Sequence, residues 1–190
     1  QMCIRDRTLV KDLVDAGSMS KEVINWTQGD VMNQFISGNI AMMVNGPWQV
    51  PTMREQAPDL NWDVTLLPKD AEYASCLGGE NFGVIDGDNV DAALDFLQFA
   101  TSKDEVASYI DDFGYIAARK DVAEGQFTDD ETMQKFTEEM QYAQPRGPHA
   151  QWPEISDALS LAVNESITGT STPSDAAAKA QSTIDSILAE

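Results

Sequence analysis

Residues 35–48 read FISGNIAMMVNGPW, and this stretch carries most of the information about the fold. Apolar residues at helical spacing over residues 30–37 are followed by Gly38, where glycine commonly ends a helix. Residues 40–44 are continuously apolar, which predicts a buried strand. A turn follows, and its Pro47 suits the first position of a new helix. The stretch predicts helix, strand, turn and helix in succession, which is typical of the α/β class.

The flanking sequence extends this pattern. Alternation predicts a strand over residues 62–66, and a short apolar run predicts another over residues 82–85. From residue 89 onward the chain is predicted to be mostly helical, with Asp88 as the first cap. Capping boxes are predicted at three helix starts: Ser102/Glu105, Thr128/Glu131 and Thr172/Asp175.

Composition and charge exclude several classes of protein. The 190 residues suffice for one domain or slightly more, and no apolar run approaches the length that crosses a bilayer. Acids outnumber bases 32 to 12, so the formal charge is −20. Such a chain repels phosphate, which argues against nucleic acid and anionic membranes as partners. The acids indicate either an ordinary solvated exterior or adaptation to high salt, in which screening relieves self-repulsion.

Histidine and cysteine are too few for most catalytic or metal centres. His149 is the only histidine, and Cys3 and Cys76 are the only cysteines. No CxxC, HExxH or GxSxG pattern is present, so we expect no metal, no cofactor and no catalytic residue. An acid pair that includes Glu80 remains open as a glycosidase site.

The first residues do not resemble a natural start. Residues 1–7, QMCIRDR, lack a signal-peptide core and resemble translated sequencing-adapter sequence, so they are left out of the fold prediction. From Thr8 the pattern is that of a helix already under way, which ends near Gly17. We therefore expect a fragment of a longer protein, with any export signal upstream.

Tryptophans and glycines mark candidate binding positions. Trp48 follows a predicted strand-to-helix turn, where open α/β sheets bind ligands. Trp152 lies between prolines with Arg146 nearby, and is either a packing plug or a ligand platform. The double glycine before Glu80 is either a plain tight turn or a place of close backbone approach. Aromatic planes beside Asn, Glu and Arg suit a sugar, whose C–H face stacks and whose hydroxyls need polar partners.

The sequence from Phe35 to Trp48 resembles the core motif of the family 1 extracellular solute-binding proteins, the sugar-binding components of ABC importers. Further motifs follow in the order typical of that family over about residues 8–190. They are Leu67-Pro68, Gly78-Gly79, the helix ending Phe96-Leu97-Gln98-Phe99-Ala100-Thr101-Ser102, Phe113-Gly114-Tyr115-Ile116, a Pro-Arg-Gly-Pro stretch, and Thr172-Pro173-Ser174-Asp175-Ala176-Ala177. Tyr115-Ile116 departs from the Leu-Pro often found there.

The resemblance implies a type II periplasmic-binding-protein-like fold, in which two α/β lobes hold a ligand between them. This chain would be the C-terminal half. Residues 8–79 and 116–190 would belong to the second lobe, and residues 80–115 would cross into the first. Helices over residues 89–112 would then expose an apolar face.

The resemblance also implies a set of substrate-binding residues. They are Asn45, Trp48, Gly79, Glu80, Asn81, Arg146 and Trp152. We expect the ring of Trp48 to be accessible to solvent.

The function that follows is a non-enzymatic, exported receptor, periplasmic or lipid-anchored at the cell surface. It would be a monomer that delivers a sugar or oligosaccharide to the membrane subunits of an ABC permease. Two alternatives remain: the same fold binding a polyamine, thiamine or another small cation, or a carboxylate-dependent glycoside-processing enzyme.

Overall fold

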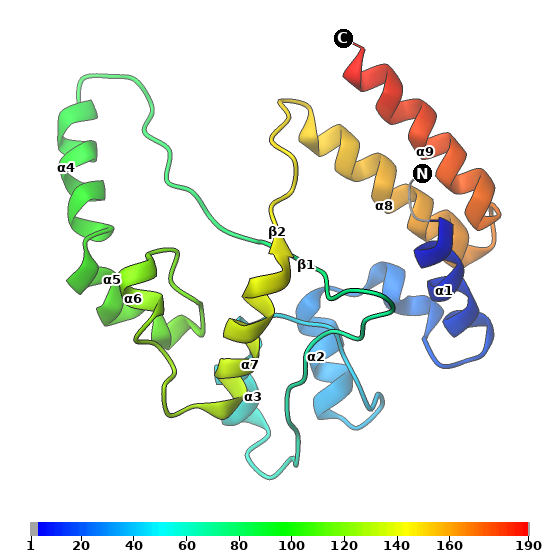
Figure 1. Ribbon diagram of the computed structural model, residues 1–190, viewed down its shortest axis with the longest axis horizontal. Coiled ribbons are helices and arrows are strands. Elements are labelled where there is room, and N and C mark those ends of the chain that lie inside the picture. The colour runs from blue at the N-terminus through cyan, green and yellow to red at the C-terminus, as the bar shows by residue number, and fades with distance from the viewer. Residues whose placement is uncertain (1–3, 190) are drawn as a thin grey trace. The chain divides into compact units, whose positions relative to one another are not determined.

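The computed structural model describes residues 4–189, which are mostly helical (Figure 1). The chain divides into two compact units. The first contains the described parts of Gln1–Thr27 and Gly147–Glu190, and the second is Gln28–Arg146. The lobe boundaries expected near residues 79 and 115 stay a prediction.

The first unit is a helical hairpin with one further helix against it. It contains α1 (Ile4–Asp15), a 3₁₀ helix (Lys21–Asn25), α8 (Trp152–Thr168) and α9 (Pro173–Leu188). Helices α8 and α9 pack through three alanines that are almost fully buried, Ala162, Ala176 and Ala180. Small side chains allow the two backbones to approach closely, and α1 packs against both helices. The predicted cap of α9 is confirmed, since Thr172 Oγ1 accepts a hydrogen bond from Asp175 N at 3.1 Å.

Helix α1 begins earlier than expected. Ile4–Asp15 is continuous, and Thr8 Oγ1 donates to Ile4 O at 2.8 Å across the expected break after residue 7. Arg7 is buried, with 6% of its surface exposed. Residues 4–7 therefore continue the helical backbone bonding of the residues that follow. The foreign origin of residues 1–7 stays a prediction, and Cys3 lies outside the described residues.

The second unit contains most of the remaining elements. Its α-helices are α2 (Gln28–Ile36), α3 (Val50–Gln56), α4 (Val90–Ala100), α5 (Lys103–Tyr109), α6 (Lys120–Ala123) and α7 (Glu131–Glu139). Its 3₁₀ helices are Pro47–Gln49, Asp111–Phe113 and Met140–Tyr142. Two short strands, β1 (Ser75–Cys76) and β2 (Ala143–Gln144), pair in parallel with Ser75 opposite Ala143.

The expected sheet is the main error of the sequence prediction. Residues 40–44, 62–66 and 82–85 form no strand, and β1 with β2 is the one strand pair within residues 4–189. Residues 62–66 keep the predicted alternation of half-buried and exposed side chains, whereas Val44 is 75% exposed. An apolar run becomes a strand only when a neighbour supplies its ladder of hydrogen bonds, and here none does. The described residues are therefore mostly helical, with one short pair of parallel strands.

Helix ends were predicted better than strands. Gly38 follows α2 with a φ of 72°, as expected of a helix-ending glycine. Ser102 precedes α5 without a side-chain capping bond, and Asn89, rather than Asp88, occupies the cap position of α4. The cap of α7 is Asp130 instead of Thr128.

Asp130 does two structural tasks at once. Its carboxylate accepts from Met133 N at 3.1 Å and caps α7. It also receives two hydrogen bonds from the guanidinium of Arg54 on α3, at 2.7 and 2.8 Å. The Arg54 guanidinium lowers the pKa of Asp130, and Asp130 raises the pKa of Arg54. The pair joins α3 to the start of α7.

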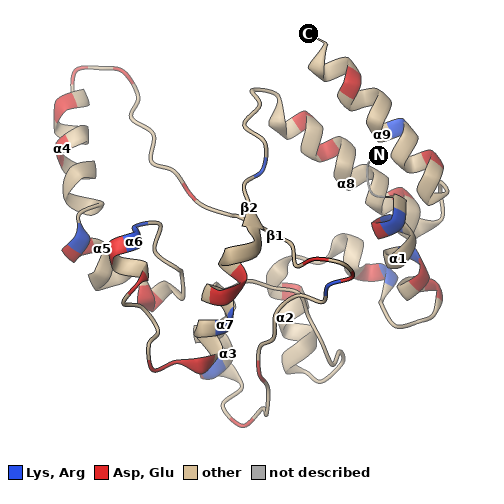
Figure 2. Cartoon of the chain, in the orientation of Figure 1, with Lys and Arg blue, Asp and Glu red and all other residues tan. Residues whose placement is uncertain are grey.

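The surface is acidic and locally apolar. Figure 2 shows acidic residues along helices of both units. Leu94, Phe96 and Phe99 on α4 are 52%, 61% and 58% exposed, which confirms the expected apolar face over residues 89–112. Within residues 4–189, no helix is long and apolar enough to cross a membrane.

Two substitutions separate the roles of Asp130. Asp130→Ala removes the cap and the ion pair, and should lower the free energy of unfolding by about 1–2 kcal/mol. Asp130→Asn keeps a good capping side chain and loses the charge, so it should cost less than about 1 kcal/mol. Urea denaturation followed by circular dichroism measures both. Equal losses would contradict a separate contribution from the cap.

The same pair predicts a loss of stability in acid. Because folding lowers the pKa of Asp130, its carboxylate stabilises the folded state at neutral pH. That contribution is lost as the pH falls below about 4 and through the folded-state pKa. Between neutral pH and pH 3, Asp130→Asn should therefore lose less stability than the wild type. Equal acid sensitivity of the two proteins would show that the pair contributes nothing.

Candidate functional site

Trp48 lies on the 3₁₀ helix that leads into α3, and its position depends on the glycine two residues before it. The Trp48 ring covers Gly46 so closely that a Cβ at Gly46 would overlap the ring. The ring is half-buried, with Tyr115 as an aromatic neighbour whose centroid is 6.0 Å away, at 38° between the planes. Trp48 is therefore accessible to solvent as predicted, although no strand precedes it.

Asn45 has its side chain engaged by the protein. Its Nδ2 donates to Gln28 O at 2.9 Å, and its Oδ1 accepts from Gly46 N at 3.0 Å. These bonds tie the turn before Trp48 to the start of α2. The geometry gives Asn45 a structural task, and ligand contact by Asn45 stays a prediction.

The parallel strands bring Arg146 beside the double glycine. Leu77 N donates to Gln144 O at 2.9 Å, directly after the β1–β2 pair. Arg146 Nη2 then donates to Leu77 O at 3.4 Å and lies near Gly78. This contact joins residues far apart in the sequence.

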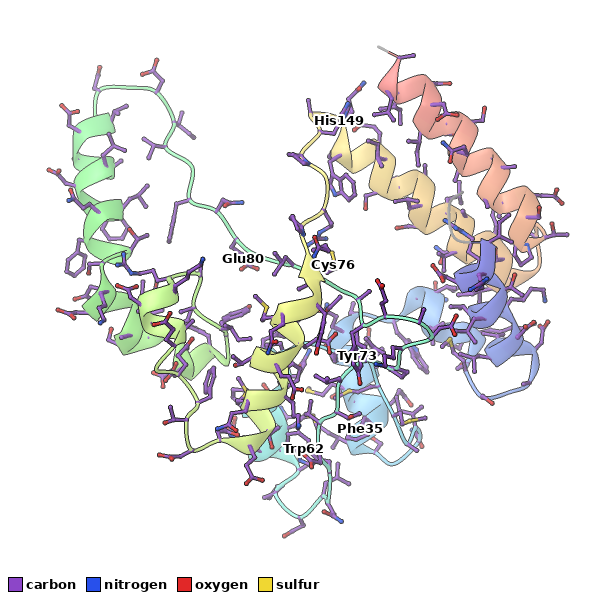
Figure 3. The ribbon with its side chains drawn as sticks, viewed as in Figure 1. Phe35, Trp62, Tyr73, Cys76, Glu80 and His149 are labelled. Atoms are coloured by element: carbon purple, nitrogen blue, oxygen red, sulfur yellow. The ribbon has the colours of Figure 1, made fainter. Side chains whose placement is uncertain are left out.

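Gly79, Glu80 and Asn81 are exposed on the extended segment beyond β1. Figure 3 shows Glu80 on that segment, past Cys76 of β1. Gly79, Glu80, Asn81 and Arg146 thus lie in one unit, on the segments that follow β1 and β2. Their contact with a ligand stays a prediction.

Trp152 belongs to the other unit, where it is the first residue of α8. Its backbone N donates to His149 O at 3.0 Å, and the side chain is half-buried. His149 Nδ1 also accepts from Gln151 N at 3.2 Å, so this histidine helps to begin the helix. Its ring nitrogen has a structural partner there.

Aromatic residues that the sequence analysis did not select accompany these positions. Tyr115 contacts Trp48, and Phe113 lies 6.5 Å from Tyr115 by ring centroid. Tyr73 and Tyr142, which precede β1 and β2, have centroids 4.8 Å apart. The sequence contained a signal for Tyr115, because Phe113-Gly114-Tyr115 is part of a family motif. Sequence spacing could not show that Trp48 is the aromatic neighbour of Tyr115.

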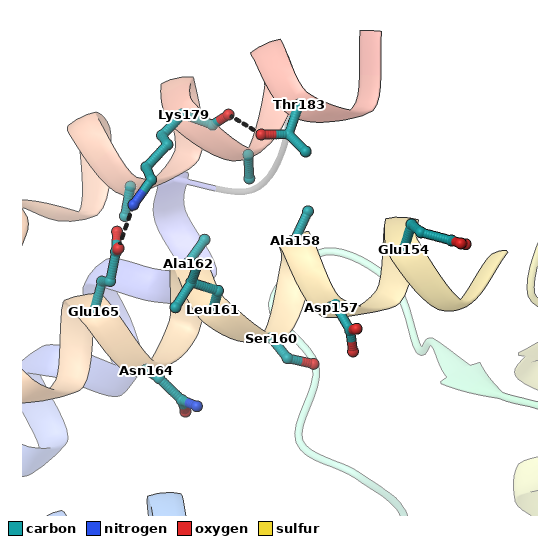
Figure 4. A pocket seen from close by; sticks show the side chains of 12 residues that line it. Glu154, Asp157, Ala158, Ser160, Leu161, Ala162, Asn164, Glu165, Lys179 and Thr183 are labelled. Carbon is teal, nitrogen blue, oxygen red and sulfur yellow. Dashed lines mark hydrogen bonds and ion pairs between the residues drawn. The ribbon is translucent and has the colours of Figure 1, made fainter. Parts of the chain in front are cut away.

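A shallow pocket lies between α8 and α9 in the first unit, with a volume of about 570 Å³ (Figure 4). Its floor includes Ala162 and Ala180, and Lys179 forms an ion pair with Glu165 at its edge. The Lys179 hydrogen bond lowers the pKa of Glu165. The predicted binding residues do not line this pocket.

Within residues 4–189, no group of three or more His, Cys, Asp or Glu side chains is arranged to hold a metal ion. Cys76 is exposed and forms no disulfide bond with another described residue.

A model of the bacterial extracellular solute-binding protein family matches residues 7–135. The chain belongs to this family. The match includes the turn at Trp48, β1 and the aromatic neighbour Tyr115, although it ends before Arg146 and Trp152. The family is one of extracellular binding proteins and not of enzymes, and membership alone does not specify the solute.

Curated relatives agree with this membership. Three are proteins named only as binding proteins, from Brucella abortus (strain 2308), Brucella abortus biovar 1 (strain 9-941) and Brucella suis biovar 1 (strain 1330). Each is 28% identical to the chain over 180 residues, which cover 90% of this chain and 44% of the relative. The chain thus spans less than half the length of the curated relatives it matches.

A methyl group at Gly46 tests the position of the Trp48 ring. Gly46→Ala should displace the ring and lower the free energy of unfolding by about 1–3 kcal/mol, the usual cost of overpacking. Gly79→Ala is the matched control, because a Cβ there meets nothing within 4 Å and should cost less than about 0.5 kcal/mol. Urea denaturation gives both values. A neutral Gly46→Ala would mean that the ring does not rest on this glycine.

Proposed function

We propose that the chain is part of the extracytoplasmic binding component of an ABC importer, with a sugar or oligosaccharide as its ligand. Family membership supports the coarse function, solute binding outside the cell. The chain spans 44% of its curated relatives, so the activity and partners of the whole protein belong to the proposal. The whole protein would be a monomer that is exported to the periplasm or anchored by lipid to the cell surface.

The observation that carries the sugar proposal is the half-buried, solvent-accessible ring of Trp48. Gly46, beneath the ring, and Asn45, which ties down the turn, hold the Trp48 segment in place. A fixed aromatic plane stacks on the apolar C–H face of a sugar with little loss of conformational freedom. The adjacent ring of Tyr115 enlarges the apolar surface.

Polar recognition would come from the segments that follow β1 and β2. Arg146 has a planar fork of donors suited to neighbouring hydroxyls or to a carboxylate on an acidic sugar. Glu80 and Asn81 add acceptors and a further donor on the adjacent segment. Trp152 stays a further stacking residue predicted from the sequence alone.

Transport would depend on closure of two lobes around the ligand, which a permease in the membrane recognises. In this proposal the chain is the C-terminal half and provides one wall of the cleft. A single wall buries less of the ligand than a closed cleft does. We therefore expect the chain alone to bind more weakly than the full-length protein.

A small organic cation is the second candidate ligand, and the formal charge of −20 favours it. A polyamine would be attracted to the acidic surface, and its ammonium groups could lie over aromatic faces. Salt distinguishes the two ligands. Binding of a cation should weaken steeply as ionic strength rises, whereas binding of a neutral sugar should change little.

Calorimetric titration of the full-length protein with glucose, maltose, cellobiose, maltotriose, spermidine and thiamine tests the proposal. We expect a saccharide to bind, and Trp48→Ala to weaken its affinity at least about tenfold, because truncating a central aromatic anchor often costs 2 kcal/mol or more. Phe96→Ala is the control, since Phe96 is 61% exposed on α4 and should leave affinity unchanged.

Three results would contradict the sugar proposal. Binding of spermidine or thiamine alone would favour the cation. Binding that is indifferent to Trp48→Ala would place the site elsewhere. Release of shorter sugars from maltotriose, detected by chromatography, would indicate an enzyme.

Arg146 should affect affinity in a ligand-dependent way. Arg146→Ala removes one long hydrogen bond to Leu77 O and should leave the far-ultraviolet circular dichroism unchanged. It should weaken an acidic sugar such as glucuronate more than glucose, because a guanidinium pairs with a carboxylate through two bonds. Arg146→Lys should recover only part of the difference. Equal losses for both ligands would remove the carboxylate role.

A further inference from the structure

Tyr115 is a second candidate ligand-binding ring in the same unit as Trp48. The two centroids are 6.0 Å apart with 38° between the planes, so the rings form an angled surface rather than a slot. Two parallel rings that enclose a third would stand farther apart than this. A ligand would therefore lie across both rings on one side. Phe113 extends the row, since its centroid is 6.5 Å from Tyr115 and its side chain is 57% exposed.

The backbone on both sides of Tyr115 is held by one side chain. Gln126 Oε1 accepts from Ala117 N at 2.8 Å, and Gln126 Nε2 donates to Tyr115 O at 3.2 Å. The same Nε2 donates to Asp111 Oδ1. Gln126 thus ties the segment 115–117 to the 3₁₀ helix before it.

Gly114 allows the Tyr115 segment to lie close to the segment that carries Trp48. Its φ is 66°, in the left-handed region that disfavours other residues. A Cβ at Gly114 would lie 2.9 Å from Pro47 O and from Pro51 Cδ. Only glycine satisfies both conditions, and the contact places the residue next to Tyr115 directly beside the segment that carries Trp48.

The ring of Tyr115 is not needed for the nearest apolar core. That core consists of Val106, Ala117 and Val122, and the partly buried side chains packed against it are Tyr109, Ile110 and Ala123. Tyr115 contacts Trp48 and Phe113 instead, and it remains half-buried. A ring whose backbone is held by Gln126, and which is left partly open to solvent, is suited to ligand contact.

We propose that Tyr115 forms the ligand-stacking surface together with Trp48, and that Gln126 is the residue that positions it. This inference rests on the proposed sugar-binding function. Trp48 would supply the central plane, and Tyr115 would contact a second part of the ligand at an angle to it.

The first test compares Tyr115→Leu with Tyr115→Phe in the full-length protein. The probe is whichever of glucose, maltose, cellobiose and maltotriose binds the wild type most tightly. Tyr115→Leu should weaken its affinity about three- to tenfold, and Tyr115→Phe, which keeps the ring, by no more than about threefold. Phe99→Leu is the control, because Phe99 is an exposed aromatic residue on α4 that belongs to neither the Trp48 nor the Tyr115 segment.

The second test asks whether Gln126 acts through Tyr115. Gln126→Glu keeps the acceptor for Ala117 N, loses the donor to Tyr115 O and places a second negative charge beside Asp111. It should weaken affinity about threefold or more. In the double variant with Tyr115→Leu, the two losses should not add, because a positioning residue has nothing left to position. If Gln126 had only a structural role, the losses of affinity in the double variant would add.

The outcomes separate this inference from the proposed function. If Trp48→Ala loses tenfold while Tyr115→Leu binds as the wild type does, Tyr115 is not a ligand residue and the sugar proposal stands. If the losses of Gln126→Glu and Tyr115→Leu add, the positioning role is overturned. If the wild type binds none of the four saccharides, the proposed function fails, and this inference fails with it.

Discussion

The close approach of Gly114 to Pro47 and Pro51 is the constraint on which the pairing of Trp48 with Tyr115 depends. The left-handed backbone of Gly114 and the absence of a side chain allow two segments far apart in the sequence to touch. One segment carries Trp48 and the other carries Tyr115. Without this contact, the two rings would have no reason to share a surface.

Local hydrogen bonds and packing then hold the segment on which each ring is carried. Asn45 and the packing of the Trp48 ring against Gly46 hold the Trp48 turn. Gln126 holds the Tyr115 segment. In each case a polar side chain bonds a backbone group outside the regular helices, Gly46 N for Asn45 and Tyr115 O for Gln126. Irregular segments thereby become fixed enough to present an aromatic plane.

Whether a helix or strand can be predicted depends on how far apart in the sequence its bonding partners lie. Helices depend on neighbours within four residues, so the cap at Thr172 and the end at Gly38 could be predicted. Strands depend on a partner elsewhere, so residues 40–44 and 62–66 were assigned a structure that no partner supports. The cap of α7 shows the same limit, since Asp130 prevails over Thr128 while also pairing with Arg54 from another helix.

The sequence alone determined the helical segments, the acidic exterior, the family and the candidate role of Trp48, because each is expressed in composition, local spacing or an ordered set of motifs. Only the tertiary structure decided which residues meet. It placed Arg146 beside Gly78 through the β1–β2 pair, gave Asn45 a backbone partner in Gln28, and set Tyr115 against Trp48. Such contacts join distant segments, and their energies depend on a geometry that no local pattern records.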